Sequence, residues 1–198
     1  MINFVTGDIF ESKASGSLAH CISSDAKMSQ GLAKVFVKIF PKLMVLKNIS
    51  LEIGTAFPVC DNGRFLYNLI TKNRYWNKPK VGCLKSSLLS MRAHAEQFGV
   101  ETINVPQLGA GLDGLDFYGQ VLPVIEHLFV ESAVDVVVHL FNDKEMRYVC
   151  NSLWSQTKCV VAWLTNWVPI KMFCCLVDHL CRVVHHYFLT PTLTPKIT

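Results

Sequence analysis

The chain has 198 residues, of which 51% are apolar and 17% are charged, and its formal net charge is +4. One core of this size can bury most of its apolar surface, so the length accommodates a domain with an appendage. The net charge is too small for charge alone to indicate nucleic-acid binding, and the chain has no run of basic residues. The cysteines show no paired spacing before residue 149, and the N-terminus MINFVTGDIF has no long apolar stretch. We therefore predict buried free thiols and no secretory signal.

Composition divides the chain near Phe141. Residues 1–141 hold 13 Lys and Arg against 12 Asp and Glu, whereas residues 142–198 hold 6 against 3, with three of the four tryptophans and five of the eight cysteines. We predict one domain over residues 1–141 and an apolar, Cys- and Trp-rich extension over residues 142–198.

Within the first part, short apolar runs alternate with helical spacing. We predict strands at Ile2–Val5 and Ser17–Ser23, a helix at Gly31–Phe40, a hairpin from Ala56–Cys60 and Phe65–Ile70 around Asn62-Gly63, a helix from Leu84 to Gly99, a strand at Thr102–Val105, a helix at Tyr118–Glu131 and a strand at Val134–Phe141. Alternation with one hairpin predicts a mixed sheet that helices cover on both faces.

The most informative stretch follows the strand at 102–105. Pro106 ends that strand, and Gly109-Ala110-Gly111 then form a loop of little bulk before Asp113. Glycines allow positive φ, and successive N–H groups in such a turn can converge on an anion, so a diphosphate is the natural candidate ligand. A tight strand-to-helix turn with a solvated aspartate is the alternative.

Five blocks in order resemble a macrodomain, of the type of terminal ADP-ribose protein glycohydrolase and O-acyl-ADP-ribose deacylase. The blocks are Gly7-Asp8-Ile9-Phe10, Leu18–Ser23, Met28–Ala33, Leu69–Lys72 and Gly109–Asp113. The resemblance covers residues 1 to about 141 and implies a three-layer α/β/α fold with a central mixed sheet. One departure is SSDAKMSQG at residues 23–31, where many water-using macrodomains carry Asn-Ala-Ala-Asn and three glycines. It favours the lysine/aspartate group of the family.

The resemblance also implies the roles of individual residues. Asp8, with the Ile9 backbone beside it, would receive the adenine amino group, although a turn aspartate is the alternative. Gly31 and the loop would cradle the diphosphate, and the loop residues concerned are Leu108, Gly109, Ala110, Gly111 and Leu112. His20, Cys21 and Ser23 would lie beneath the distal ribose, with packing favoured over chemistry for His20 and Cys21.

In this family type a lysine attacks the anomeric carbon of the distal ribose and an aspartate exchanges protons. Lys72 and Asp113 stand at those two positions, although without the resemblance Lys72 would be a solvated lysine. The implied function is hydrolysis of ADP-ribose from acidic residues of proteins and of O-acyl-ADP-ribose, without metal or cofactor. The implied partners are ADP-ribose and ADP-ribosylated proteins, with ADP-ribosylated nucleic acid left open. A monomer of nucleus and cytoplasm, acting in the DNA-damage response, is expected.

Two other classes of function stay open. One is a reader module that binds ADP-ribose without turnover, and the other is a protein anchored to a membrane or partner by residues 142–198. The apolar stretch Cys159–Val177 is interrupted by Pro169 and Lys171, which disfavours a spanning helix and leaves an interfacial segment, a partner-binding helix or an irregular extension. Cys175, His179, Cys181 and His185 fit no standard zinc spacing, so packing is favoured there.

Overall fold

The computed structural model describes residues 1–10 and 16–140, so the predictions for residues 142–198 lie outside the described part. The described residues form a six-stranded sheet of order β1-β6-β5-β2-β4-β3. The strands are β1 (Ile2–Thr6), β2 (Ser17–Ser23), β3 (Ala56–Asp61), β4 (Arg64–Lys72), β5 (Thr102–Pro106) and β6 (Asp135–Leu140). Neighbouring strands are parallel except for β3, which pairs antiparallel to β4. The predicted mixed sheet is therefore confirmed.

The hairpin of β3 and β4 follows directly from its turn residues. Asn62 and Gly63 both have positive φ, at 47° and 80°, as the favoured two-residue hairpin turn requires. The prediction of a hairpin at Asn62-Gly63 is confirmed.

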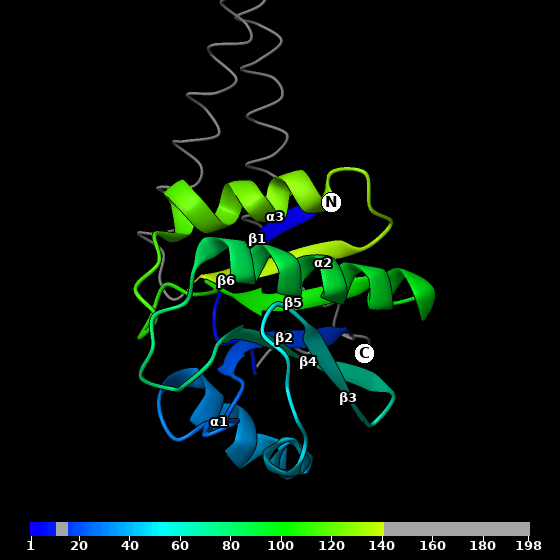
Figure 1. Cartoon of the computed structure of the whole chain (residues 1–198). Helices are drawn as coiled ribbons and strands as arrows, with labels where there is room; N and C mark the ends of the chain where they lie inside the picture. The colour runs from blue at the N-terminus through cyan, green and yellow to red at the C-terminus, as the bar shows by residue number, and fades with distance from the viewer. Residues whose placement is uncertain (11–15, 141–198) are drawn as a thin grey trace, which may run out of the picture. The chain divides into compact units, whose positions relative to one another are not determined.

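Helices cover both faces of the sheet (Figure 1). The helical segments are α1 (Gly31–Ile39), the 3-10 segment η1 (Pro41–Asn48), α2 (Val81–Gln97), the π-helical turn η2 (Phe117–Val121) and α3 (Leu122–Phe129). Figure 1 shows α1 on one face and α2 and α3 on the other, which gives the predicted three layers. None of the helices in the described ranges is long and apolar enough to cross a membrane.

Successive side chains of each strand point to opposite faces of the sheet and so fill two apolar cores, one on each face. On the α1 side, Leu18 and Ile22 of β2 join a buried cluster that includes Phe36 of α1 and Leu43 and Leu46 of η1. On the other side, the largest buried side chains of α2 are Leu84, Leu88 and Met91. Burial of such side chains provides roughly 1.5–3 kcal/mol each, so the sheet is fixed between two apolar layers.

Two helical segments differ from the prediction. The segment Pro41–Asn48 was not predicted, because its buried residues Leu43 and Leu46 are three apart and fit a tighter helix than the α-helical spacing. The helix predicted at Tyr118–Glu131 begins one residue earlier with the π-helical turn, where the Asp116 side chain accepts a hydrogen bond from the Gly119 N–H.

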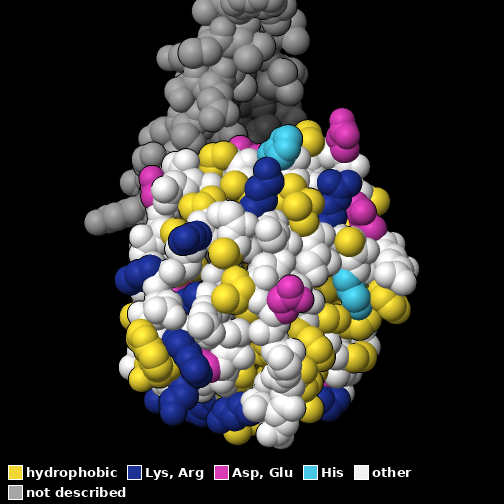
Figure 2. Space-filling model, viewed as in Figure 1, with side chains coloured by type: hydrophobic (Ala, Val, Ile, Leu, Met, Phe, Trp, Pro, Cys, Tyr) yellow, Lys and Arg dark blue, Asp and Glu magenta, His cyan; other side chains and the backbone are white. Residues whose placement is uncertain are grey.

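Basic side chains gather over the α1 layer. Figure 2 shows dark blue side chains at the lower end of the described surface, the end at which Figure 1 places α1. The segments α1 and η1 carry Lys34, Lys38, Lys42 and Lys47 and no Asp or Glu. This layer therefore presents positive charge, which favours anionic ligands nearby.

Candidate active site

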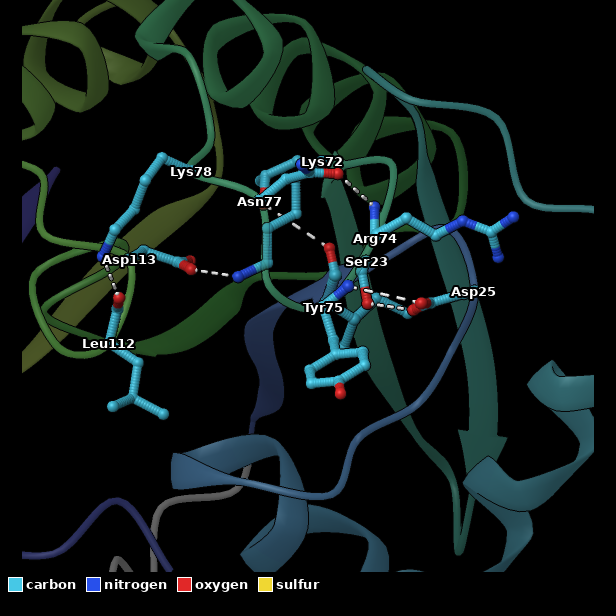
Figure 3. A network of polar contacts seen from close by, with 11 residues as sticks. Ser23, Asp25, Lys72, Arg74, Tyr75, Asn77, Lys78, Leu112 and Asp113 are labelled. Carbon is cyan, nitrogen blue, oxygen red and sulfur yellow. Dashed lines mark hydrogen bonds and ion pairs between the residues drawn. The ribbon is translucent and has the colours of Figure 1, made fainter.

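Three strand ends meet at one edge of the sheet. The strands β5, β2 and β4 are neighbours and run parallel, so the segments that follow them emerge on the same side. These segments begin at Pro106, Ser23 and Lys72. Figure 3 shows side chains from all three of them gathered around Lys72 and Asp113. Ligands of open α/β sheets bind at this edge.

The side chains of Lys72 and Asp113 are in direct contact. The Lys72 Nζ atom forms an ion pair with the Asp113 Oδ1 atom, and the two side chains are only 12% and 13% exposed. A register shift precedes Lys72: Ile22 pairs with Ile70, but Ser23 pairs with Lys72. One extra residue in β4 re-aims the side chains that follow, as bulges near active sites commonly do.

The loop after β5 is held by its own backbone. The Ala110 N–H donates to the Gln107 carbonyl at 3.2 Å, and the Leu115 N–H donates to the Gly109 carbonyl at 2.9 Å. Gly109 has φ +73°, and a Cβ atom there would lie 2.7 Å from the Leu115 Cδ1 atom. Only glycine suits this position, because a side chain would be strained and would overlap its neighbour.

The N-terminus of α1 lies against the same loop. Gly31 has φ +55°, and a Cβ atom there would lie 3.0 Å from the Leu112 Cδ1 atom. The residue before it, Gln30, gives α1 no side-chain cap. The Leu112 side chain of the loop thus lies against the N-terminus of α1, and helix N-termini with free N–H groups bind phosphates in many proteins.

Cys21 lies beneath the loop and close to the ion pair. Burial and the charge of Asp113 raise the pKa of the Cys21 thiol to about 12, although a hydrogen bond from the Gly109 backbone and the charge of Lys72 oppose this shift. The thiol is therefore protonated at neutral pH and unsuited to act as a nucleophile.

His20 and Ser23 lie in the interior rather than at the surface of the site. His20 is 1% exposed, stacks on Phe36 with ring centroids 3.9 Å apart, and shares a hydrogen bond of 2.9 Å with Asn68. Burial lowers its pKa to about 4, against the opposing bond to Asn68, so the ring is neutral. The Ser23 hydroxyl is buried and donates to Asp25 at 2.5 Å. Both side chains therefore have packing and hydrogen-bonding roles beneath the site.

Asp8 and Ile9 lie at the far end of the sheet edge. Asp8 follows β1, is exposed, and accepts a hydrogen bond of 3.0 Å from the Phe10 N–H, which is the turn role considered as the alternative. Ile9 is buried in the α1-side core. Leu108 is buried as well, whereas Ala110 is half-buried and Gly111 is exposed.

The sequence did not point to the network around Asp25. Asp25 accepts hydrogen bonds from the Ser23 hydroxyl, from the Tyr75 N–H at 3.3 Å and from the Lys27 N–H at 3.4 Å (Figure 3). Partial burial alone would raise its pKa, but these bonds and the charge of Arg74 outweigh burial and lower it. The network ties the segment after β4 to the segment after β2. A Ser-x-Asp pattern directly after a strand was the available signal.

Metal binding finds no support among residues 1–10 and 16–140, where no group of three or more His, Cys, Asp or Glu could hold an ion.

Comparison with known sequences places the chain near ADP-ribose glycohydrolases. No protein-family model matches the chain. The chain is 36% identical over 138 residues to the human ADP-ribose glycohydrolase OARD1, across 70% of this chain and 90% of that protein. It is 26% identical over 125 residues to a DNA ADP-ribosyl glycohydrolase of Thermus aquaticus, across 58% of this chain and 34% of that protein.

Solved structures share the fold. The macrodomain of Mycobacterium tuberculosis DarG aligns with a TM-score of 0.65 at 20% identity, covering 72% of this chain and 99% of that one. The DarTG protein of Thermosipho africanus in complex with ADP-ribose aligns with a TM-score of 0.61 at 23% identity, covering 70% of this chain and 41% of that one. With the 36% identity over nine-tenths of OARD1, these findings show that the chain belongs to the macrodomain family, in the group that includes the ADP-ribose glycohydrolase OARD1.

Proposed function

We propose that this protein hydrolyses ADP-ribose from acidic residues of proteins and deacylates O-acyl-ADP-ribose. The observation that carries the proposal is the contact between Lys72 and Asp113, because a module that only reads ADP-ribose needs no paired amine and carboxylate. The similarity to a protein named ADP-ribose glycohydrolase gives independent support.

The site has the dimensions of an extended two-ended ligand. From Asp8, after β1, to Lys72, at the end of β4, the sheet order crosses four strand spacings. At the usual spacing between strands this is about 19 Å. The loop at 109–112 follows β5, which lies between these two strands in the sheet, and its Leu112 contacts the N-terminus of α1. Asp8 would then accept from the adenine, the loop and α1 would hold the diphosphate, and the distal ribose would meet Lys72.

The ion pair supplies both groups that the reaction needs. Transfer of one proton from the Lys72 ammonium to Asp113 leaves a neutral amine beside a carboxylic acid. The amine forms a bond to the anomeric carbon as the bond from that carbon to the acyl oxygen breaks, and Asp113 gives its proton to the departing carboxylate. Asp113 then removes a proton from water, which attacks the same carbon and expels the Lys72 amine. The products are free ADP-ribose and the carboxylic acid, and return of the proton from Asp113 to the Lys72 amine restores the ion pair.

The test measures release of ADP-ribose from a glutamate-linked ADP-ribosylated protein. We compare the full chain with Lys72→Ala, Asp113→Ala and the control Lys85→Ala, which removes an exposed lysine of α2. We expect loss of release in the first two variants, retained release in the control and retained binding of ADP-ribose in all. Binding without release by the full chain would instead identify a reader module, and absence of binding would refute both.

A specific observation favours nucleic-acid-linked ADP-ribose as a second substrate. Tyr75 and Trp76 follow closely after Lys72, with their rings edge to face at 4.8 Å, and Trp76 is 65% exposed. The segment that carries these rings, residues 72–80, contains four Lys and Arg and no Asp or Glu. Exposed aromatic rings on a basic surface bind single-stranded nucleic acid by stacking on bases. The acceptor beyond the anomeric carbon would meet this surface.

Paired substrates test this second activity. A stacked base contributes roughly 1–3 kcal/mol, so Trp76→Ala should lower kcat/KM for ADP-ribosylated single-stranded DNA at least 5-fold and leave O-acyl-ADP-ribose turnover unchanged. The control is Phe98→Ala, which removes an exposed ring from the opposite end of α2. Equal losses on both substrates would refute base stacking at Trp76.

A further inference from the structure

Asp113 is the third residue of a β-turn and does not have a positive φ, whereas a flip of the central peptide would give it one. The turn runs from Gly111 to Gly114, and the Gly114 N–H donates to the Gly111 carbonyl at 3.1 Å. The peptide between Leu112 and Asp113 is the central one. The two common turn types differ by a flip of this peptide, with little movement of the ends of the turn. A hydrogen bond that holds the Leu112 carbonyl therefore also fixes the backbone conformation of Asp113.

Lys78 provides such a hydrogen bond. Its Nζ atom donates to the Leu112 carbonyl at 2.7 Å (Figure 3). Because the peptide is planar and trans, a carbonyl held toward Lys78 directs the Asp113 N–H to the opposite side. We propose that Lys78 is a positioning residue, which locks the catalytic turn in the orientation that presents the Asp113 carboxylate to Lys72. This inference rests on the proposed hydrolase function.

The chain holds Lys78 itself in place on both sides. Before it, the Asn77 N–H donates to the Arg74 carbonyl and the Asn77 side chain accepts from the Arg74 N–H, both at 2.9 Å. After it, Pro79 has a restricted φ, and α2 begins at Val81. The lysine passes close to the turn, since a Cβ atom at Gly114 would lie at a contact distance of 3.5 Å from the Lys78 Nζ atom. The contact is thus made between two constrained segments.

The contact made by Lys78 matters most during the chemical step, when the contact made by Lys72 is lost. Two lysines of one segment hold adjacent residues of the loop: Lys72 holds the Asp113 side chain and Lys78 holds the Leu112 carbonyl. When the Lys72 amine moves to the anomeric carbon, the first contact is lost and the second remains. Loss of the Lys78 contact should therefore affect the chemical step more than binding, because the turns at 107–110 and 109–115 have their own backbone bonds.

Kinetics of Lys78→Met test the proposal, with Lys78→Arg as the conservative variant and Lys80→Met as an exposed control. Misplacement of a reacting group by 1 Å can cost about 100-fold in rate. We expect kcat for O-acyl-ADP-ribose to fall about 10- to 100-fold in Lys78→Met, with KM within about 2-fold, and to be restored in large part by arginine. An unchanged kcat, a rise in KM alone, or an equal loss in Lys80→Met would overturn the proposal.

NMR spectroscopy tests the turn without reference to hydrolysis. The bond from the Gly114 N–H to the Gly111 carbonyl is present in both turn types, so the amide of Asp113, which belongs to the central peptide, reports the flip. In Lys78→Met we expect the Asp113 amide resonance to shift or broaden, while the Leu115 amide resonance stays unchanged. An unchanged Asp113 resonance would refute the lock at Lys78. A changed Asp113 resonance, combined with no ADP-ribose release by the full chain, would support the lock and refute the hydrolase.

Discussion

Gly109→Ala is the most decisive perturbation of the loop, because the same loop contains its own control. Gly109 has φ +73°, and left-handed backbone costs a residue with a side chain roughly 1–2 kcal/mol. The new Cβ atom would lie 2.7 Å from the Leu115 Cδ1 atom and 3.3 Å from the Leu115 Cβ and Cγ atoms. Overpacking of this kind costs roughly 1–3 kcal/mol. We therefore expect Gly109→Ala to lower the free energy of unfolding by about 2 to 5 kcal/mol.

Gly111→Ala should instead raise the free energy of unfolding. Gly111 has no left-handed φ, and a Cβ atom there would meet nothing within 4 Å. Replacement of such a glycine restricts the unfolded chain and stabilises by about 0.4 to 1 kcal/mol. Urea unfolding of the full chain and both variants, followed by circular dichroism, measures the difference. Equal midpoints for the two variants would refute the conformation that we assign to the loop.

Two further predictions concern buried titratable groups. The pKa of His20 is lowered to about 4, so between about pH 7 and about pH 5 the unfolded chain binds a proton that the folded chain does not. The free energy of unfolding should fall over this range by about 2 kcal/mol from His20 alone. In His20→Gln the fall between the same two pH values, measured by urea unfolding at each pH, should be smaller by that amount. An equal fall in both proteins would contradict the buried neutral ring. Cys21, whose pKa is about 12, should react with iodoacetamide at about pH 8 at least 100-fold more slowly than the exposed Cys60, as peptide mapping would measure. Comparable rates would mean that Cys21 is accessible as a thiolate.

Local chemistry explains why much of the fold was predictable. The Asn62-Gly63 pair specifies its turn by backbone conformation alone, and the apolar runs of β2 and β6 specify buried strands. The residues that follow the strand ends were predictable for the same reason, since parallel strands bring them to one edge. Apart from the 3-10 segment Pro41–Asn48, the strands and helices from Ile2 to Leu140 therefore agree with the sequence patterns within a few residues at their ends.

The contacts that organise the site depend on residues far apart in the chain. Lys72 and Asp113 were paired through the family resemblance, not through spacing. Lys78 contacts Leu112 across 34 positions, and Asp25 contacts Tyr75 across 50. No local pattern predicts such pairs, because they arise from the register of β2 against β4 and from the extra residue in β4.

The segment after β4 connects the other two strand-end segments, and this arrangement bears on catalysis. Toward the segment after β2, Ser24 donates to the Asn73 carbonyl and the Tyr75 N–H donates to Asp25. Toward the loop after β5, Lys72 and Lys78 make the contacts. Of these ties, only the one made by Lys72 must break if Lys72 attacks the substrate. In the proposed mechanism the remaining three contacts would keep their places during that step, so Lys72 would act as the nucleophile without loosening the loop that carries Asp113.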